Sequence, residues 1–253
     1  MIKMKKTALI TGATSGIGRA TAHEFAKHGI NLILCGRRQS RLDIIKKALD
    51  RETKVHTLNF DVRNKKEVFD AIASLPEEFK SINILINNAG NAHGLDPIQD
   101  GNLDDWDAMM DINVKGLLYM SKAVIPQMTE RHSGHIINIG SSAGKEVYPK
   151  GNVYCGSKHA VLAITEGMRI DLNPYGIKVT AINPGLVETE FSQVRFKGDK
   201  AADSVYKGYK ALQAEDIAEI IYFAISRPSH VNIADLLVLP SAQACSTLIN
   251  KKL

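Results

Sequence analysis

The stretch TALITGATSGIG, residues 7–18, decides the fold of this chain. An apolar run ends in a turn that contains Gly12, Gly16 and Gly18, and the sequence that follows, GIGRATAHEF, has the apolar spacing of a helix. Glycines in a strand-to-helix turn let the backbone approach a ligand closely, and free N–H groups at a helix start favour an anion. The stretch therefore predicts a pyrophosphate-binding turn. Its GxxxGxG spacing differs from the general GxGxxG fingerprint, so a plain glycine turn remains the alternative.

Short apolar runs and segments of helix length alternate along the rest of the chain. The pattern predicts seven strands joined by crossovers, hence a mostly parallel, doubly wound sheet with helices on both faces. No linker or repeat divides the chain, so one α/β domain over residues 1–253 is expected. One segment, about 186–212, lacks a predicted strand and mixes aromatic with charged residues, as a lid over a substrate site would. The predicted strands are 7–11, 31–35, 55–60, 82–87, 135–140, 178–183 and 236–239.

Composition narrows the class of protein. The 253 residues are 44% hydrophobic and 23% charged, as in ordinary globular domains. The net charge of +5 comes from scattered basic residues rather than from a stripe with interleaved aromatics, which argues against a nucleic-acid partner. No segment reaches the ~18 apolar residues of a membrane span. Three widely spaced cysteines offer no disulfide framework, so we expect a cytoplasmic protein.

The end of the second predicted strand indicates which dinucleotide is bound. An acidic residue there usually binds the ribose 2′-hydroxyl of NAD, whereas arginine suits the 2′-phosphate of NADP. This chain reads NLILCGRRQSRL, with Arg37 and Arg38 in the turn and no acid at the strand end. Arginine binds phosphate through two parallel hydrogen bonds, so NADP is the predicted cofactor. The alternative is a solvated basic helix start.

The stretch YCGSK, residues 154–158, places Tyr154 and Lys158 four positions apart in a predicted helix. Residues at this spacing share one helix face. A neighbouring ammonium group lowers the pKa of a phenol from about 10, toward the range of a general acid or base. No metal is expected: His93 and His135 have no second ligand at metal-binding spacing.

These motifs, with NNAG at 87–90, Asn113 and Ser141 in the same order and separations, resemble those of the short-chain dehydrogenase/reductase family. The resemblance covers residues 6 to about 240. It implies a single Rossmann-like domain that binds a nicotinamide dinucleotide and moves hydride to or from a carbonyl carbon. A dinucleotide-sensing binding protein without activity is the alternative from another class.

The resemblance also implies roles for individual residues. Tyr154 is expected to exchange the proton, and Lys158 to lower its pKa and hold the nicotinamide ribose. Ser141 should bind the substrate oxygen, and Asn113 should hold a water that links Lys158 to solvent. The expected cofactor contacts, from the turn, the strand ends and the segment after Pro184, are Gly12, Thr14, Ser15, Gly16, Ile17, Gly18, Arg37, Arg38, Asp61, Val62, Asn88, Ala89, Gly90, Tyr154, Lys158, Pro184, Gly185, Val187 and Thr189.

A closer resemblance, carried by GRRQSRL, DVRN, GHIINIGS, GNVY, PGLVETEFSQVRFKGD and PSHVNI, is to NADP-dependent 3-hydroxy acid dehydrogenases. Relatives oxidise serine, L-allo-threonine or 3-hydroxyisobutyrate, or reduce malonic semialdehyde; some reduce sulfoacetaldehyde. An anionic substrate needs a positive anchor, because a buried unpaired carboxylate is costly. Arg195 is the candidate anchor and Tyr148 a hydroxyl partner; a surface arginine is the alternative. A general carbonyl reductase for bulky ketones is the remaining enzyme hypothesis.

Family members are commonly homo-oligomers formed through two long helices, which here match residues 103–131 and 152–173. By analogy a homotetramer is favoured and a dimer is the second choice.

Overall fold

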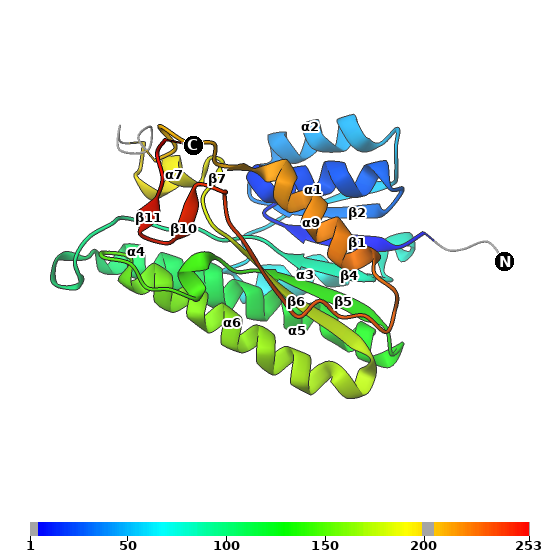
Figure 1. The fold of residues 1–253 in the computed structure, drawn as a ribbon. Helices are drawn as coiled ribbons and strands as arrows, with labels where there is room; N and C mark the ends of the chain where they lie inside the picture. The colour runs from blue at the N-terminus through cyan, green and yellow to red at the C-terminus, as the bar shows by residue number, and fades with distance from the viewer. Residues whose placement is uncertain (1–4, 199–204, 253) are drawn as a thin grey trace.

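The computed structural model describes residues 5–198 and 205–252. Its centre is a seven-stranded sheet in the order β3-β2-β1-β4-β5-β6-β9, and every neighbouring pair is parallel (Figure 1). The predicted doubly wound α/β fold is confirmed, with each predicted strand in place. The strands are β1 (Thr7–Thr11), β2 (Asn31–Gly36), β3 (Val55–Asn59), β4 (Ile84–Asn87), β5 (Gly134–Ile139), β6 (Ile177–Pro184) and β9 (Asp235–Val238).

Helices cover both faces of this sheet, because successive side chains of a strand point to opposite sides. Ala8 and Ile10 of β1 face a core that also contains residues of α1, α2 and α9, whereas Leu9 faces the core shared with α3 and α5. Figure 1 shows α1, α2 and α9 on one side and α5 and α6 on the other. The helices are α1 (Gly16–Lys27), α2 (Gln39–Leu49), α3 (Lys65–Ala73), α4 (Leu103–Met110), α5 (Leu117–Glu130), α6 (Asn152–Leu172) and α9 (Ala214–Ser226).

A π-helical turn, Asp111–Gly116, joins α4 to α5 and makes one long helical rod of them. Such turns interrupt the regular i→i+4 ladder and often occur at functional sites. Asn113 lies in this turn and is buried.

The segment predicted to lack a strand does contain two short ones, and the prediction is corrected here. β7 (Val187–Glu188) pairs in parallel with β8 (Leu212–Gln213), and α7 (Phe191–Arg195) lies between them. Two residues per strand leave no periodicity to detect in a sequence. The side chain of Gln243 in β10 (Gln243–Cys245) accepts a hydrogen bond from Leu186 N at 2.9 Å, which ties the segment start to the C-terminal hairpin with β11 (Leu248–Ile249). Residues 199–204 lie outside the described residues.

No helix in the described part of the chain has the length and apolarity needed to cross a membrane.

The buried His135 on β5 makes stability depend on pH. Its Nε2 lies 2.9 Å from Thr180 Oγ1, while Nδ1 has no partner among the described residues. Burial, and then the charges of Lys178 and Lys6, lower its pKa to about 3. Between about pH 6.5 and 3 the unfolded chain therefore binds a proton that the native state does not, so stability falls as the pH falls.

We expect His135→Gln to remove this dependence, because glutamine does not titrate. Between pH 7 and 5 the free energy of unfolding of the wild type should fall by about 2 kcal/mol more than that of the variant. Urea titrations at both pH values measure the difference, with the exposed His230→Gln as matched control. Equal losses for the wild type and His135→Gln would contradict the prediction.

Candidate active site

The two residues of the YCGSK pair lie on the first turns of α6, next to the end of β5. Tyr154 is 8% and Lys158 7% exposed. Lys158 Nζ donates to the carbonyl oxygen of Ile139 at 3.0 Å, its one hydrogen bond among the described residues. Two of its three N–H groups therefore remain available for a ligand.

The expected lowering of the pKa of Tyr154 by Lys158 stays a prediction, and other groups around the phenol also act on this pKa. Burial is the largest influence and raises the pKa of the phenol, the charge of Tyr148 adds to this, and the hydrogen bond with Ser141 and the charge of Arg195 lower it. Burial also lowers the pKa of Lys158 to about 8. Burial thus favours the neutral form of both groups. The phenol of Tyr154 keeps its proton, and the ammonium group of Lys158 loses its proton more easily than an exposed lysine does.

Ser141 follows β5 and begins a 3₁₀ turn, Ser142–Gly144. Its Oγ accepts a hydrogen bond from Ala143 N at 3.1 Å, so the hydroxyl proton remains available to donate. Ser141 also lowers the pKa of the Tyr154 phenol, so the two hydroxyl groups lie near each other. Ser142, the next residue, forms part of the turn itself.

Asn113 reaches the same region from the π-helical turn. Its Nδ2 donates to Asn91 O at 2.9 Å and Ser157 Oγ at 3.0 Å, and its Oδ1 accepts from Asn91 N at 2.9 Å. Both amide donors are therefore used within the protein. One lone pair of Oδ1 remains for the water that the sequence led us to expect.

The glycine-rich turn brings its own backbone segments close together. Gly12 has φ +65°, and a Cβ at Gly18 would collide with the carbonyl oxygen of Gly12. Ser15 does not cap α1, and no acidic residue lies in the first turn of that helix. The N–H groups at this helix start are therefore open to an anion, as a pyrophosphate needs. Ile17 packs its side chain against the core.

The residues of NNAG support this turn from the neighbouring strand. Asn88 Nδ2 donates to Thr11 O at 2.9 Å and Gly12 O at 3.3 Å, and Ala89 N donates to Thr11 Oγ1 at 3.0 Å. The side chain of Asn88 thus holds the turn rather than pointing into an open cleft. A Cβ at Gly90 would lie 2.9 Å from Asn113 Oδ1, so this glycine permits the close approach of the two segments.

Arg38 binds the glycine-rich turn and a distant acid together. Its Nη2 donates to Thr14 Oγ1 and Ser15 Oγ, each at 2.9 Å, and its Nη1 to Glu190 at 3.0 Å. Arg41, on the first turn of α2, donates to the other oxygen of Glu190 at 2.6 Å. A basic cluster therefore lies beside the turn, where a ribose phosphate would be recognised.

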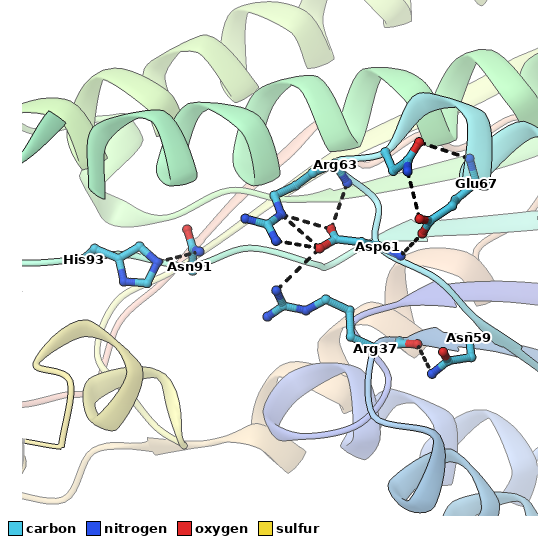
Figure 2. A network of polar contacts seen from close by, with 9 residues as sticks. Arg37, Asn59, Asp61, Arg63, Glu67, Asn91 and His93 are labelled. Atoms are coloured by element: carbon cyan, nitrogen blue, oxygen red, sulfur yellow. Dashed lines mark hydrogen bonds and ion pairs between the residues drawn. The ribbon is translucent and has the colours of Figure 1, made fainter. Parts of the chain in front are cut away.

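Asp61 follows β3 and is held by two arginines (Figure 2). Arg63 Nη2 lies 2.7 Å and Arg37 Nη1 3.6 Å from Asp61 Oδ2. Partial burial opposes the shift, but the hydrogen bonds from Arg63 and the charge of Arg37 lower the pKa of Asp61. Both its carboxylate oxygens are thus engaged within the protein. Its neighbour Val62 is buried, and a Cβ at Gly116 would lie 2.9 Å from its side chain.

The segment after Pro184 lies across the glycine-rich turn. Gly185 N donates to Val238 O at 2.7 Å, and Val187 belongs to β7. A Cβ at Gly16 would lie 3.3 Å from the side chain of Thr189. Thr189 Oγ1 also accepts from Phe191 N at 3.2 Å, so it serves the start of α7 as well.

Arg195 and Tyr148, proposed from the sequence alone, meet beside Tyr154. Arg195 Nη1 donates to Tyr148 Oη at 2.8 Å and its Nε to Gly94 O at 3.1 Å. Its guanidinium carbon lies 5.4 Å from the ring centroid of Tyr154. Nη2 of Arg195 has no hydrogen-bond partner among the described residues. A small pocket beside it is lined by residues that include His93, Trp106 and Tyr154.

The short chain dehydrogenase profile matches residues 6–200. The chain belongs to this family, and the resemblance found in the sequence is confirmed. One relative is sulfoacetaldehyde reductase 2 of Chromohalobacter salexigens, which is 46% identical over 96% of this chain and 97% of that protein. Another is the NADP-dependent 3-hydroxy acid dehydrogenase of Schizosaccharomyces pombe, which is 47% identical over 98% of this chain and 97% of that protein. The fold of this chain matches the closed form of a serine dehydrogenase complexed with NADP+, with a TM-score of 0.91, 43% identity and coverage of 96% and 98%.

Two residues of the site were missed from the sequence. Arg41 belongs to the same basic stretch as Arg38, and its position on the first turn of the next helix could have indicated it. No sequence pattern indicated Glu190 as part of the site, because it lies 152 positions from its partner Arg38.

Proposed function

We propose that this protein is an NADP-dependent dehydrogenase of small hydroxy acids, which also reduces the corresponding acid aldehydes. The substrate class comprises 3-hydroxy acids such as serine, L-allo-threonine and 3-hydroxyisobutyrate, with reduction of malonic semialdehyde in the reverse direction. The relative named NADP-dependent 3-hydroxy acid dehydrogenase is 47% identical over 98% of this chain and supports the proposal.

The position of Arg195 carries the substrate assignment. Its guanidinium lies next to the phenol of Tyr154, the group that would exchange a proton with the substrate oxygen. A fork of N–H groups can bind a carboxylate or a sulfonate through parallel hydrogen bonds. A substrate with an anionic group close to its carbonyl carbon would therefore be oriented by Arg195, with Tyr148 as hydroxyl partner.

The residues divide the chemistry as follows. When bound, the dinucleotide supplies or accepts the hydride. In reduction the hydroxyl of Tyr154 donates its proton to the substrate oxygen while the hydroxyl of Ser141 holds that oxygen; in oxidation the phenolate takes the proton back. Lys158, with two open N–H groups, holds the nicotinamide ribose, and Asn113 positions the water behind it.

Recognition of NADP falls to Arg38, with Arg37 and Arg41 beside it. The glycine-rich turn would hold the pyrophosphate at the start of α1. The segment 186–212 serves as a lid over the substrate. The protein acts in the cytoplasm as a homotetramer, with the α4–α5 rod and α6 as the contact surfaces.

Sulfoacetaldehyde reduction is the second candidate, favoured by the relative of that name. Both functions need the same anchor, because carboxylate and sulfonate are small anions.

A substrate panel tests the proposal. We expect oxidation of small 3-hydroxy acids and reduction of malonic semialdehyde and sulfoacetaldehyde, with kcat/KM at least about tenfold higher for NADP(H) than for NAD(H), the worth of one charge-assisted hydrogen bond. Absorbance of the reduced nicotinamide measures turnover, and neutral aldehydes of the same size serve as controls. Equal or higher kcat/KM for bulky neutral ketones would instead assign a general carbonyl reductase, and no turnover with any substrate would assign a binding protein.

A further inference from the structure

The carboxylate of Glu190 occupies a site that is built for an anion. Its two oxygens accept one hydrogen bond each, from Arg38 Nη1 at 3.0 Å and Arg41 Nη1 at 2.6 Å. Partial burial opposes the shift, but these hydrogen bonds lower the pKa of Glu190, so the group is ionised at neutral pH.

Arg38 is also attached to the glycine-rich turn, because its Nη2 donates hydrogen bonds to Thr14 and Ser15. The rest of the segment also lies close, since Thr189 meets Gly16 of the same turn. Glu190 therefore reaches the basic cluster from the start of α7, whereas Arg38 and Arg41 belong to the start of α2. Two arginines this close repel each other, and the carboxylate offsets that repulsion.

A ribose 2′-phosphate would require the same donors. Its oxygens bind guanidinium groups through the same parallel hydrogen bonds as a carboxylate does. The two anions cannot share Arg38 and Arg41 without like-charge repulsion. The pairs are 40–45% exposed at each side chain, so their exchange is not prevented by burial.

We infer that Glu190 is an internal stand-in for the 2′-phosphate of NADP, which holds Arg38 and Arg41 in place and is displaced when that phosphate binds. The inference rests on the proposed role of Arg38. Glu190 thus weakens NADP binding and limits discrimination against NAD, because NAD carries no phosphate that competes with the carboxylate.

The test compares ligands that differ only in this phosphate. Isothermal titration calorimetry gives Kd for NADP+, NAD+, adenosine 2′,5′-bisphosphate and 5′-AMP with the wild type and with Glu190→Gln. We expect the variant to bind NADP+ and the bisphosphate about five- to tenfold more tightly, from the loss of two exposed ion pairs. NAD+ and 5′-AMP should change less than about twofold, because neither ligand competes with the carboxylate.

Glu188→Gln is the matched control, because it removes the same charge two positions away on a side chain whose described hydrogen bond is with Gln213, not with an arginine. Its Kd values should equal those of the wild type. If Glu188→Gln tightened NADP+ binding equally, the effect would be a general effect of charge, and the inference would be overturned. Unchanged or weaker NADP+ binding by Glu190→Gln would also overturn the inference. Glu190→Ala should agree in direction with Glu190→Gln.

The same titrations distinguish a failure of this inference from a failure of the proposed function. If the wild type binds the bisphosphate no more tightly than 5′-AMP, Arg38 and Arg41 do not recognise the phosphate, and the inference falls with that assignment. If the wild type discriminates and Glu190→Gln does not tighten binding, the inference alone is wrong. In a chain that also carries Arg38→Ala and Arg41→Ala, Glu190→Gln should have no effect.

Discussion

Replacing Tyr154 by phenylalanine should lower kcat/KM by about 10²–10⁴, the usual contribution of general acid–base catalysis. The hydroxyl is the only group lost, because the ring keeps its packing against Phe191 at a centroid distance of 5.8 Å. Desolvation already keeps this phenol protonated, so without it the oxygen that gains charge during reduction has no proton donor at that position.

Cofactor affinity separates this effect from damage to the fold. The Kd of the Tyr154→Phe variant for NADP+ should stay within about twofold of the wild-type value, since the glycine-rich turn and Arg38 are untouched. Tyr175→Phe, at a tyrosine that is 40% exposed, provides the matched control and should leave kcat/KM unchanged. Retention of more than about a tenth of the activity by Tyr154→Phe would show that the proton comes from another group.

Arg195→Met should lower kcat/KM for an anionic aldehyde by about 10²-fold or more, because an anionic group would lose a partly buried, hydrogen-bonded cation. Methionine retains much of the aliphatic stem that packs near Tyr148. The same variant should keep kcat/KM for a neutral aldehyde of equal size within about threefold, since no charge pair is lost. Steady-state kinetics with sulfoacetaldehyde, malonic semialdehyde and propanal makes the comparison.

Lys197→Met is the control for this second prediction. Lys197 lies two residues further along, is 63% exposed and pairs with Asp105 at 2.9 Å, outside the proposed anchor. A similar loss on anionic and neutral aldehydes in Arg195→Met would mean that Arg195 mainly holds the loop at Gly94, to which its Nε donates. Arg195→Lys should recover part of the affinity for anions, since the charge returns without the fork.

Both predictions depend on groups that the sequence placed only in part. The spacing of Tyr154 and Lys158 established their common helix face. That spacing could not predict the effect of burial on the phenol, because the pKa of a phenol also depends on how many neighbours exclude water from it, and those neighbours come from several elements. Tyr148 and Ser141 lie outside α6, and Arg195 comes from α7. The catalytic and cofactor roles themselves stay predictions until the variants are measured.

The segment after Gly185 shows a second limit of prediction from the sequence. Its two-residue strands β7 and β8 form through pairing with each other, so neither has a periodic signal of its own. The cofactor contact expected of Asn88 stays a prediction, and the structure adds that its side-chain amide donates hydrogen bonds to the backbone of Thr11 and Gly12. An amide can satisfy either partner, and only the packed structure decides between them.

The sequence by itself determined the order of strands and helices, the glycine-rich turn, and the shared face of Tyr154 and Lys158. Each follows from local rules: side-chain periodicity, glycine conformation and helical spacing act over a few residues. The tertiary structure alone decided that Glu190 binds Arg38 and that Arg195 lies over the ring of Tyr154. These contacts join residues that are far apart in the chain. The packing of whole helices and strands brings such residues together, so local sequence patterns cannot predict the contacts.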